Sequence, residues 1–210
     1  MKYLFLLSCL IIFPLSSKEL SLNKDCLKNK DFKITLWGGQ MVDADIVDAF
    51  FLKGKIPSSR KEYLLGVGIQ KEIIKKNKNS FNFEINYLRH TGEDQIKGGL
   101  SELVASFGLY KQLNPNFKIG ILEGISYLTN TSLYEETFRK ENNKLLNYLG
   151  FEIERKINNK LFLTGRIHHR SGAFGLFGGV KDGSNGYLVG LRYLLNFKND
   201  KDKVSCKIQN

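Results

Sequence analysis

A histidine and a serine stand two residues apart in the sequence "RIHHRSGAFGLFGG" near the end of the chain. Residues two apart on a β-strand lie on the same face, so a strand here places His169 beside Ser171. An imidazole next to a hydroxyl is the general base and nucleophile of serine esterases, because the ring takes the serine proton during attack on a carbonyl. His169 and Ser171 are therefore predicted as a catalytic base and nucleophile that need a third, orienting group.

Apolar and polar residues alternate along most of the chain, as is typical of β-strands with two different faces. Helical periodicity is almost absent. Eight segments follow the two-residue period, at about 33–43, 61–73, 79–90, 99–112, 116–129, 144–157, 160–171 and 186–197. The sequence thus predicts an all-β protein in which His169 and Ser171 end the seventh strand.

The connections between these segments alternate between short and long. The short ones are "KKNKN", "NPN" and "NNK", and the long ones include "ADIVDAFFLKGKIPSSR", "TGEDQIKGG" and "NTSLYEETFRKEN". Tight periplasmic turns and longer extracellular loops are typical of barrels in the bacterial outer membrane. We therefore predict an eight-stranded antiparallel up-and-down transmembrane β-barrel over residues 33–197.

In each predicted strand the alternate residues form a polar set and an apolar set. The polar set, called the polar parity, carries charged residues that suit a water-filled lumen. Glu152 and Glu154 are expected to pair with Arg166 and Arg192 across neighbouring strands, because buried charges need partners. The aromatic-rich parity then faces lipid, with interfacial tyrosines at positions 63, 87, 187 and 193. Alternation alone also fits a soluble lipocalin-like carrier, whose apolar residues point inward around a lipid.

On the membrane assignment, His169 and Ser171 point toward lipid at the extracellular end of their strand. Asn185, on the next strand, shares this outer surface and is the candidate that orients His169. A polar pair on a lipid-facing parity has no simple structural reason, which favours catalysis. His168 points into the lumen, where Arg170 or Glu152 is its expected partner. Because adjacent histidines face opposite ways, a metal site formed by His168 and His169 is not expected.

The chain begins like an exported protein. Residues 1–17 form a predicted signal peptide, 18–32 a periplasmic N-terminal segment and 198–210 a periplasmic tail. Cys26 and Cys206 then lie on the periplasmic side, where they are expected to form a disulfide. The net charge of +11 fits an anionic membrane or a phosphate-bearing substrate, and export argues against nucleic acid.

The stretch "RIHHRSGAFGLFGGVKDGSNGYLVGLRY" resembles the C-terminal region of the PagL-type lipid A 3-O-deacylases, which are eight-stranded outer-membrane barrels. The segments "WGGQ", "EGISYLT" and "LLNYLGFEIE" resemble a divergent branch of the same family. The resemblance implies an esterase that removes an ester-linked acyl chain from lipid A or lipopolysaccharide, with Ser171 as nucleophile and His169 as base. It implies no metal and no cofactor.

The third catalytic member departs from that family's pattern. The characterised enzymes carry a glutamate behind the histidine, whereas Asn185 stands at the corresponding position here. An amide orients an imidazole but stabilises its charged form less than a carboxylate does. Asp182, in the preceding loop, is the acidic alternative. Gly172 and Gly175 are the predicted oxyanion-hole residues, because glycine lets backbone N–H groups approach a substrate.

Two function classes thus compete with an outer-membrane lipid A esterase. One is a non-enzymatic small barrel that anchors loops or stabilises the membrane, and the other is the soluble lipid carrier. In the membrane the expected partners are lipid A, lipopolysaccharide and outer-membrane lipid, with a homodimer left open.

Overall fold

The computed structural model describes residues 32–44, 46–51, 58–92, 99–133, 135–136, 143–180 and 183–195. The predicted signal peptide, the N-terminal segment to residue 31 and the C-terminal tail lie outside the described residues. So do Asp182 and both partners of the predicted disulfide, Cys26 and Cys206.

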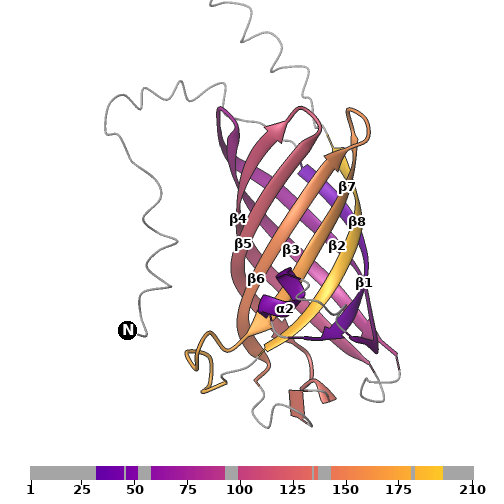
Figure 1. Cartoon of the computed structure of the whole chain (residues 1–210), viewed down its shortest axis with the longest axis vertical. Helices are drawn as coiled ribbons and strands as arrows, with labels where there is room; N and C mark the ends of the chain where they lie inside the picture. The colour runs from indigo at the N-terminus through magenta and orange to yellow at the C-terminus, as the bar shows by residue number, and fades with distance from the viewer. Residues whose placement is uncertain are drawn as a thin grey trace, which may run out of the picture. The chain divides into compact units, whose positions relative to one another are not determined.

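Eight strands form one closed barrel in which each strand pairs antiparallel with its neighbours in the chain and β1 closes onto β8 (Figure 1). The strands are β1 (Phe32–Asp43), β2 (Ser58–Lys76), β3 (Asn79–Thr91), β4 (Leu100–Asn114), β5 (Phe117–Leu128), β6 (Leu145–Lys156), β7 (Leu161–Ser171) and β8 (Gly183–Leu195). The predicted fold class is confirmed. The described residues contain no helix long and apolar enough to cross a bilayer.

The strand bounds follow the prediction closely, with one clear extension in β2. Residues 58–60 continue the pairing with β1, and residues 74–76 continue the pairing with β3, beyond the predicted 61–73. A bulge between Glu72 and Ile74 interrupts this pairing. Because a bulge shifts the alternation by one residue, Ile73 and Ile74 are both exposed on the same strand.

A short helix, α2 (Ile46–Phe51), follows β1 in the first long connection and was not predicted. It contacts the outer wall at β7 and β8 (Figure 1). The Tyr187 hydroxyl donates a hydrogen bond to the Ala49 carbonyl at 2.8 Å, and Ala49 itself is buried. Tyr187 therefore anchors the helix to the barrel.

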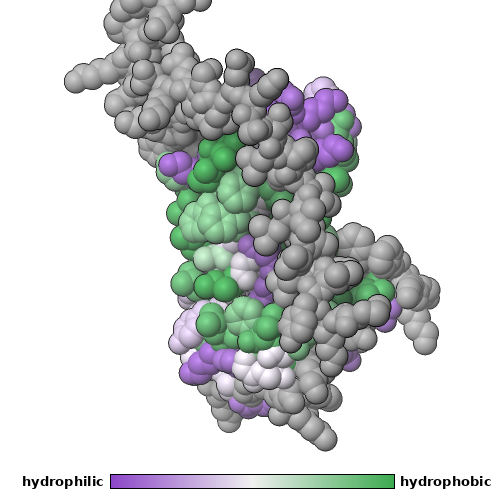
Figure 2. Space-filling model, turned by 90° about the vertical axis from the view of Figure 1, so that its left-hand side faces the viewer, coloured by the Kyte–Doolittle hydropathy of each residue, from purple (hydrophilic) through white to green (hydrophobic). Residues whose placement is uncertain are grey.

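The two faces of the wall have opposite chemistry. Outward side chains such as Leu36 (61% exposed) and Val189 (60% exposed) are apolar and open, and Figure 2 shows hydrophobic residues over one side of the wall. Inward residues such as Glu84 and Arg192 are 1% and 0% exposed. This arrangement is that of a barrel in lipid, with a polar interior and an apolar band outside. The lipocalin-like alternative, which needs the reverse, is wrong for this chain.

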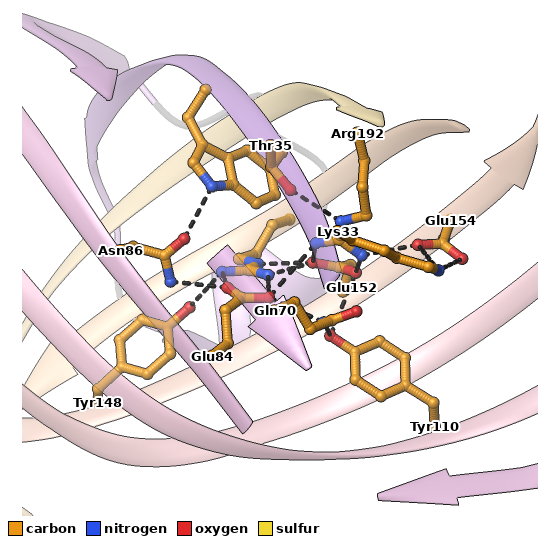
Figure 3. Close-up of polar contacts among 12 residues, drawn as sticks. Lys33, Thr35, Gln70, Glu84, Asn86, Tyr110, Tyr148, Glu152, Glu154 and Arg192 are labelled. Atoms are coloured by element: carbon orange, nitrogen blue, oxygen red, sulfur yellow. Dashed lines mark hydrogen bonds and ion pairs between the residues drawn. The ribbon is translucent and has the colours of Figure 1, made fainter. Parts of the chain in front are cut away.

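The lumen is cross-linked by ion pairs, as the parity of the charges predicted. Glu152 on β6 accepts hydrogen bonds from Arg166 on β7 and, at 2.6 Å, from Arg192 on β8. Glu84 on β3 extends the network to the far wall through a 2.6 Å contact with Arg166. Figure 3 labels Lys33, Thr35, Gln70, Glu84, Asn86, Tyr110, Tyr148, Glu152, Glu154 and Arg192 of this cluster.

Replacing Glu152 with alanine is expected to destabilise the barrel strongly. The change leaves two buried guanidinium groups without their shared acceptor, and breaking a buried pair costs about 3 to 5 kcal/mol. The free energy of unfolding is to be measured by urea titration in detergent, with heat-modifiable migration as the readout. Glu136→Ala removes an exposed loop carboxylate and is the control. Equal unfolding midpoints for the two variants would contradict a structural role for Glu152.

Candidate active site

The structure brings His169 and Asn185 together on the outer wall. They are directly opposite in the pairing of β7 with β8, and His169 Nδ1 lies 2.8 Å from Asn185 Oδ1. Both side chains are largely buried although they belong to the lipid-facing parity. The predicted contact is therefore present, and its catalytic use stays a prediction.

The amide of Asn185 is held in one orientation by the chain after β1. Its Nδ2 donates to the Ala44 carbonyl at 2.6 Å, which turns Oδ1 toward the imidazole. Because Oδ1 is only an acceptor, His169 Nδ1 carries the hydrogen and donates it. The lone pair then lies on His169 Nε2, which is the atom that a general base needs free.

Ser171 is the next outward residue on β7 and faces Gly183 on β8. A Cβ placed on Gly183 would clash with the Arg170 carbonyl oxygen and lie 2.8 Å from both His169 Cε1 and Ser171 Cβ. The ring and the serine thus converge over the same glycine, which leaves room for both. Within the described residues no hydrogen bond holds Ser171 Oγ, and none joins it to the His169 ring. The hydroxyl therefore has no other bond, within the described residues, that would keep it from a substrate.

Arg170 fixes the backbone between His169 and Ser171 from inside the barrel. Its Nη1 donates to both oxygens of Glu135 at 2.6 and 2.7 Å. Its Nη2 donates to two backbone carbonyls at the start of β6, at 2.6 and 2.8 Å. A fully buried, multiply bonded side chain loses its freedom, and the strand that carries it is held with it. Arg170 thereby restricts the movement of the backbone that carries His169 and Ser171.

The loop after Ser171 is tightly turned, with positive φ at Ala173 (46°), Phe174 (59°) and Gly175 (92°). A Cβ on Gly172 would clash with the Val180 carbonyl, so this glycine permits the two ends of the loop to approach. The Gly175 N–H donates to the Gly172 carbonyl at 3.0 Å. In this conformation the Gly175 N–H bonds within the turn. The oxyanion-hole roles of Gly172 and Gly175 stay predictions.

His168 lies in the lumen, as predicted, but with a different partner. Its Nε2 is 3.2 Å from Glu102 Oε1, and its ring packs against Tyr148 with 5.0 Å between the ring centroids. The expected pairing with Arg170 or Glu152 is wrong, because Arg170 bonds Glu135 while Glu102, on β4, projects across the lumen. Among the residues that the structure describes, no group of histidine, cysteine or acidic side chains is suited to hold a metal ion.

The segment after β1 contributes the Ala44 carbonyl to the candidate site, and the sequence does not predict this contact. The stretch "DADIVDAFF" carries acidic residues ahead of an apolar run, a pattern that indicates a helix start. The absence of a two-residue period predicts a long loop here, whereas the structure contains α2. Nothing in that pattern shows that the Ala44 carbonyl would reach Asn185, since this contact depends on how the loop folds back onto the wall.

Neither the protein-family models nor the curated proteins contain a match to this chain. Among solved structures, the chain is similar to the N-terminal β-barrel domain of Pseudomonas aeruginosa OprF at 9% identity and a TM-score of 0.48, covering 79% of this chain and 97% of that one. The attachment invasion locus protein Ail of Yersinia pestis gives 10% and 0.46, and Neisserial surface protein A gives 9% and 0.45, with the same coverage.

These similarities are too distant to say anything about function. The fold class, and with it a place in the bacterial outer membrane, follows from the closed strand order and the apolar outer wall.

Adding a methyl group at Gly183 is expected to disable the candidate site. In Gly183→Ala the new Cβ would meet the Arg170 carbonyl oxygen, the His169 ring and Ser171 Cβ, so the backbone and side chains of β7 must shift there. Reaction of Ser171 with a fluorophosphonate probe should therefore slow by about tenfold or more. Gly165→Ala is the matched control, since its Cβ would meet only Ile153 Cγ2 at an ordinary 3.6 Å on the same outer face. Equal labelling rates for the two variants would show that the ring and the serine do not depend on this glycine.

Proposed function

We propose that this barrel is an outer-membrane esterase that hydrolyses an ester-linked acyl chain of lipid A, in the manner of the PagL-type deacylases. The observation that carries the proposal is the 2.8 Å contact between His169 and Asn185 on the membrane-facing wall, next to Ser171. Placing polar side chains in a lipid-facing wall costs free energy. A histidine and an amide that orients it at this position therefore favour a functional role.

The chemistry would proceed in two acyl-transfer steps. Ser171 Oγ attacks the ester carbonyl while His169 Nε2 accepts its proton, and the same proton then passes to the leaving sugar hydroxyl. Water, deprotonated by Nε2, next attacks the acyl-serine and releases the fatty acid. Asn185 holds the ring in the tautomer that both steps require.

The position of the site matches a substrate that stays in the membrane. Phe174 and Leu176, in the loop directly after Ser171, are 80% and 60% exposed. They offer apolar surface beside the hydroxyl, where an acyl chain would lie. The net charge of +11 favours a lipid that carries phosphate groups.

A non-enzymatic barrel is the second candidate, and two observations favour it. No hydrogen bond joins Ser171 to His169 in the described structure, and the position behind His169 carries an amide where the characterised deacylases carry a carboxylate. A barrel that only anchors its loops would need no such bond.

Mass spectrometry of lipid A distinguishes the two candidates. Cells that express the wild-type chain should lose one ester-linked acyl chain from lipid A. Ser171→Ala and His169→Ala should each reduce this loss by about a thousandfold or more, because nucleophile and base act as one unit. Folding of each variant is checked by heat-modifiable migration. Unchanged lipid A in wild-type cells would favour the non-enzymatic barrel.

Asn185→Ala should lower the deacylation rate by about 10- to 100-fold without abolishing it. The change removes the group that orients the ring, and loss of an orienting partner costs activity of this order. The rate is to be measured with purified protein and lipid A in detergent micelles. A variant with full activity would remove Asn185 from the site and direct attention to Asp182.

A further inference from the structure

A second pair of polar side chains lies beside Ser171 on the membrane-facing wall, and ester hydrolysis as described above makes no use of it. Glu123, on β5, has Phe107 directly opposite on β4 and Leu149 directly opposite on β6. Its outward neighbours along β5, Ile121 and Ile125, are 49% and 47% exposed. A carboxylate thus stands in the middle of an apolar surface.

This position is unlike that of the other glutamates in the described strands, all of which have the lumen-facing parity. Those are Glu62, Glu72, Glu84, Glu102, Glu152 and Glu154. The ion pairs of the lumen explain the inward carboxylates that contact arginine or histidine. No such pair explains Glu123, because within the described residues no cation lies against it.

Asn147 connects Glu123 to the candidate active site. It is directly opposite Ser171 in the pairing of β6 with β7. Its Nδ2 donates to Glu123 Oε1 and, at 3.3 Å, to the Gly124 carbonyl. Both hydrogens of the amide are therefore used toward β5. Polar outward residues thus run in one continuous line across β8, β7, β6 and β5, namely Asn185, His169, Ser171, Asn147 and Glu123.

The unused atoms of this pair are all acceptors. Among the described residues, no hydrogen bond reaches Asn147 Oδ1 or Glu123 Oε2. An unpaired acceptor that faces hydrocarbon is unfavourable until a donor meets it. When Glu123 is ionised, the group that completes the pair brings a hydrogen-bond donor, and a hydroxyl of a membrane lipid is such a group on this wall.

We infer that Asn147 and Glu123 form a binding subsite for a hydroxyl group of the lipid substrate, next to the ester that Ser171 attacks. This subsite rests on the proposed esterase function. It would select lipids in which a hydroxyl lies close to the scissile ester, either on the acyl chain or on the alcohol side. A site built to bond a hydroxyl discriminates against the analogue that lacks one, since its acceptors then stay unpaired.

Matched esters test the selection with the full chain in detergent micelles. One pair shares an alcohol and differs only in a 3-hydroxyl on the acyl chain, and a second pair places the hydroxyl on the alcohol instead. For one of the two pairs, wild-type kcat/KM should favour the hydroxylated ester by about tenfold. Glu123→Leu and Asn147→Leu should each bring this ratio close to one. Ile121→Leu, on the same outward face of β5, should keep the wild-type ratio.

The leucine variants suit the membrane face, so misfolding is not the expected cause of a lost ratio. An equal ratio in the wild type and in both leucine variants would overturn the subsite.

A binding measurement separates this inference from the esterase proposal. Non-hydrolysable ether analogues, with and without the same hydroxyl, are titrated into the Ser171→Ala protein and detected by native mass spectrometry. Tighter binding of the hydroxylated ether, lost on adding Glu123→Leu, supports the subsite even if the wild type hydrolyses no ester, in which case only the esterase proposal fails. Ester hydrolysis without any preference in rate or binding overturns the subsite and leaves the esterase.

Discussion

Glu152 is the centre on which the interior of this barrel depends, because it accepts hydrogen bonds from two arginines on two different strands. Arg166 and Arg192 also reach Glu84 on the far wall, so β3, β6, β7 and β8 are tied together through one buried cluster. Such a cluster is stable only when every member is paired, since an isolated buried charge is very costly. A lumen filled with paired charges in this way has a structural task.

The same constraint gives meaning to the polar residues that face outward. In a lipid-facing wall each polar side chain must find partners on the protein or on a ligand. His169 and Asn185 form a hydrogen bond with each other, and Asn185 also donates one to the Ala44 carbonyl. Ser171 has no such bond among the described residues. On β7 the inward guanidinium groups of Arg166 and Arg170 are bonded to several partners, whereas no hydrogen bond within the described residues holds the outward hydroxyl of Ser171.

Period-two alternation was enough to predict the strands, because each strand has one chemistry inside and another outside. The up-and-down order came from the alternating lengths of the connections, and the charges on the polar parity showed which face is inward. The two-residue period also placed His169, Ser171 and Asn185 on one surface, because all three have the outward parity and β7 pairs with β8. It could not give the partner of His168, because Glu102 reaches it across the lumen from a strand three places away. Nor could it give α2 or the Ala44 contact, which depend on a loop folding back. Glu123 was visible in the sequence as a charge on the apolar parity of β5, but it drew no prediction.

The Ala44 contact bears on whether an amide can replace a carboxylate behind the histidine. A carboxylate accepts from the ring with either oxygen, so its rotation is harmless, whereas an amide that flips would present a donor and force the wrong tautomer. Here the flip is opposed, because Nδ2 is already bonded to a backbone carbonyl at 2.6 Å. The amide therefore supplies the orientation and lacks only the charge that steadies an imidazolium. Activity in this chain would thus depend on the segment after β1 as much as on Asn185, which makes α2 and its Tyr187 anchor part of the support of the site.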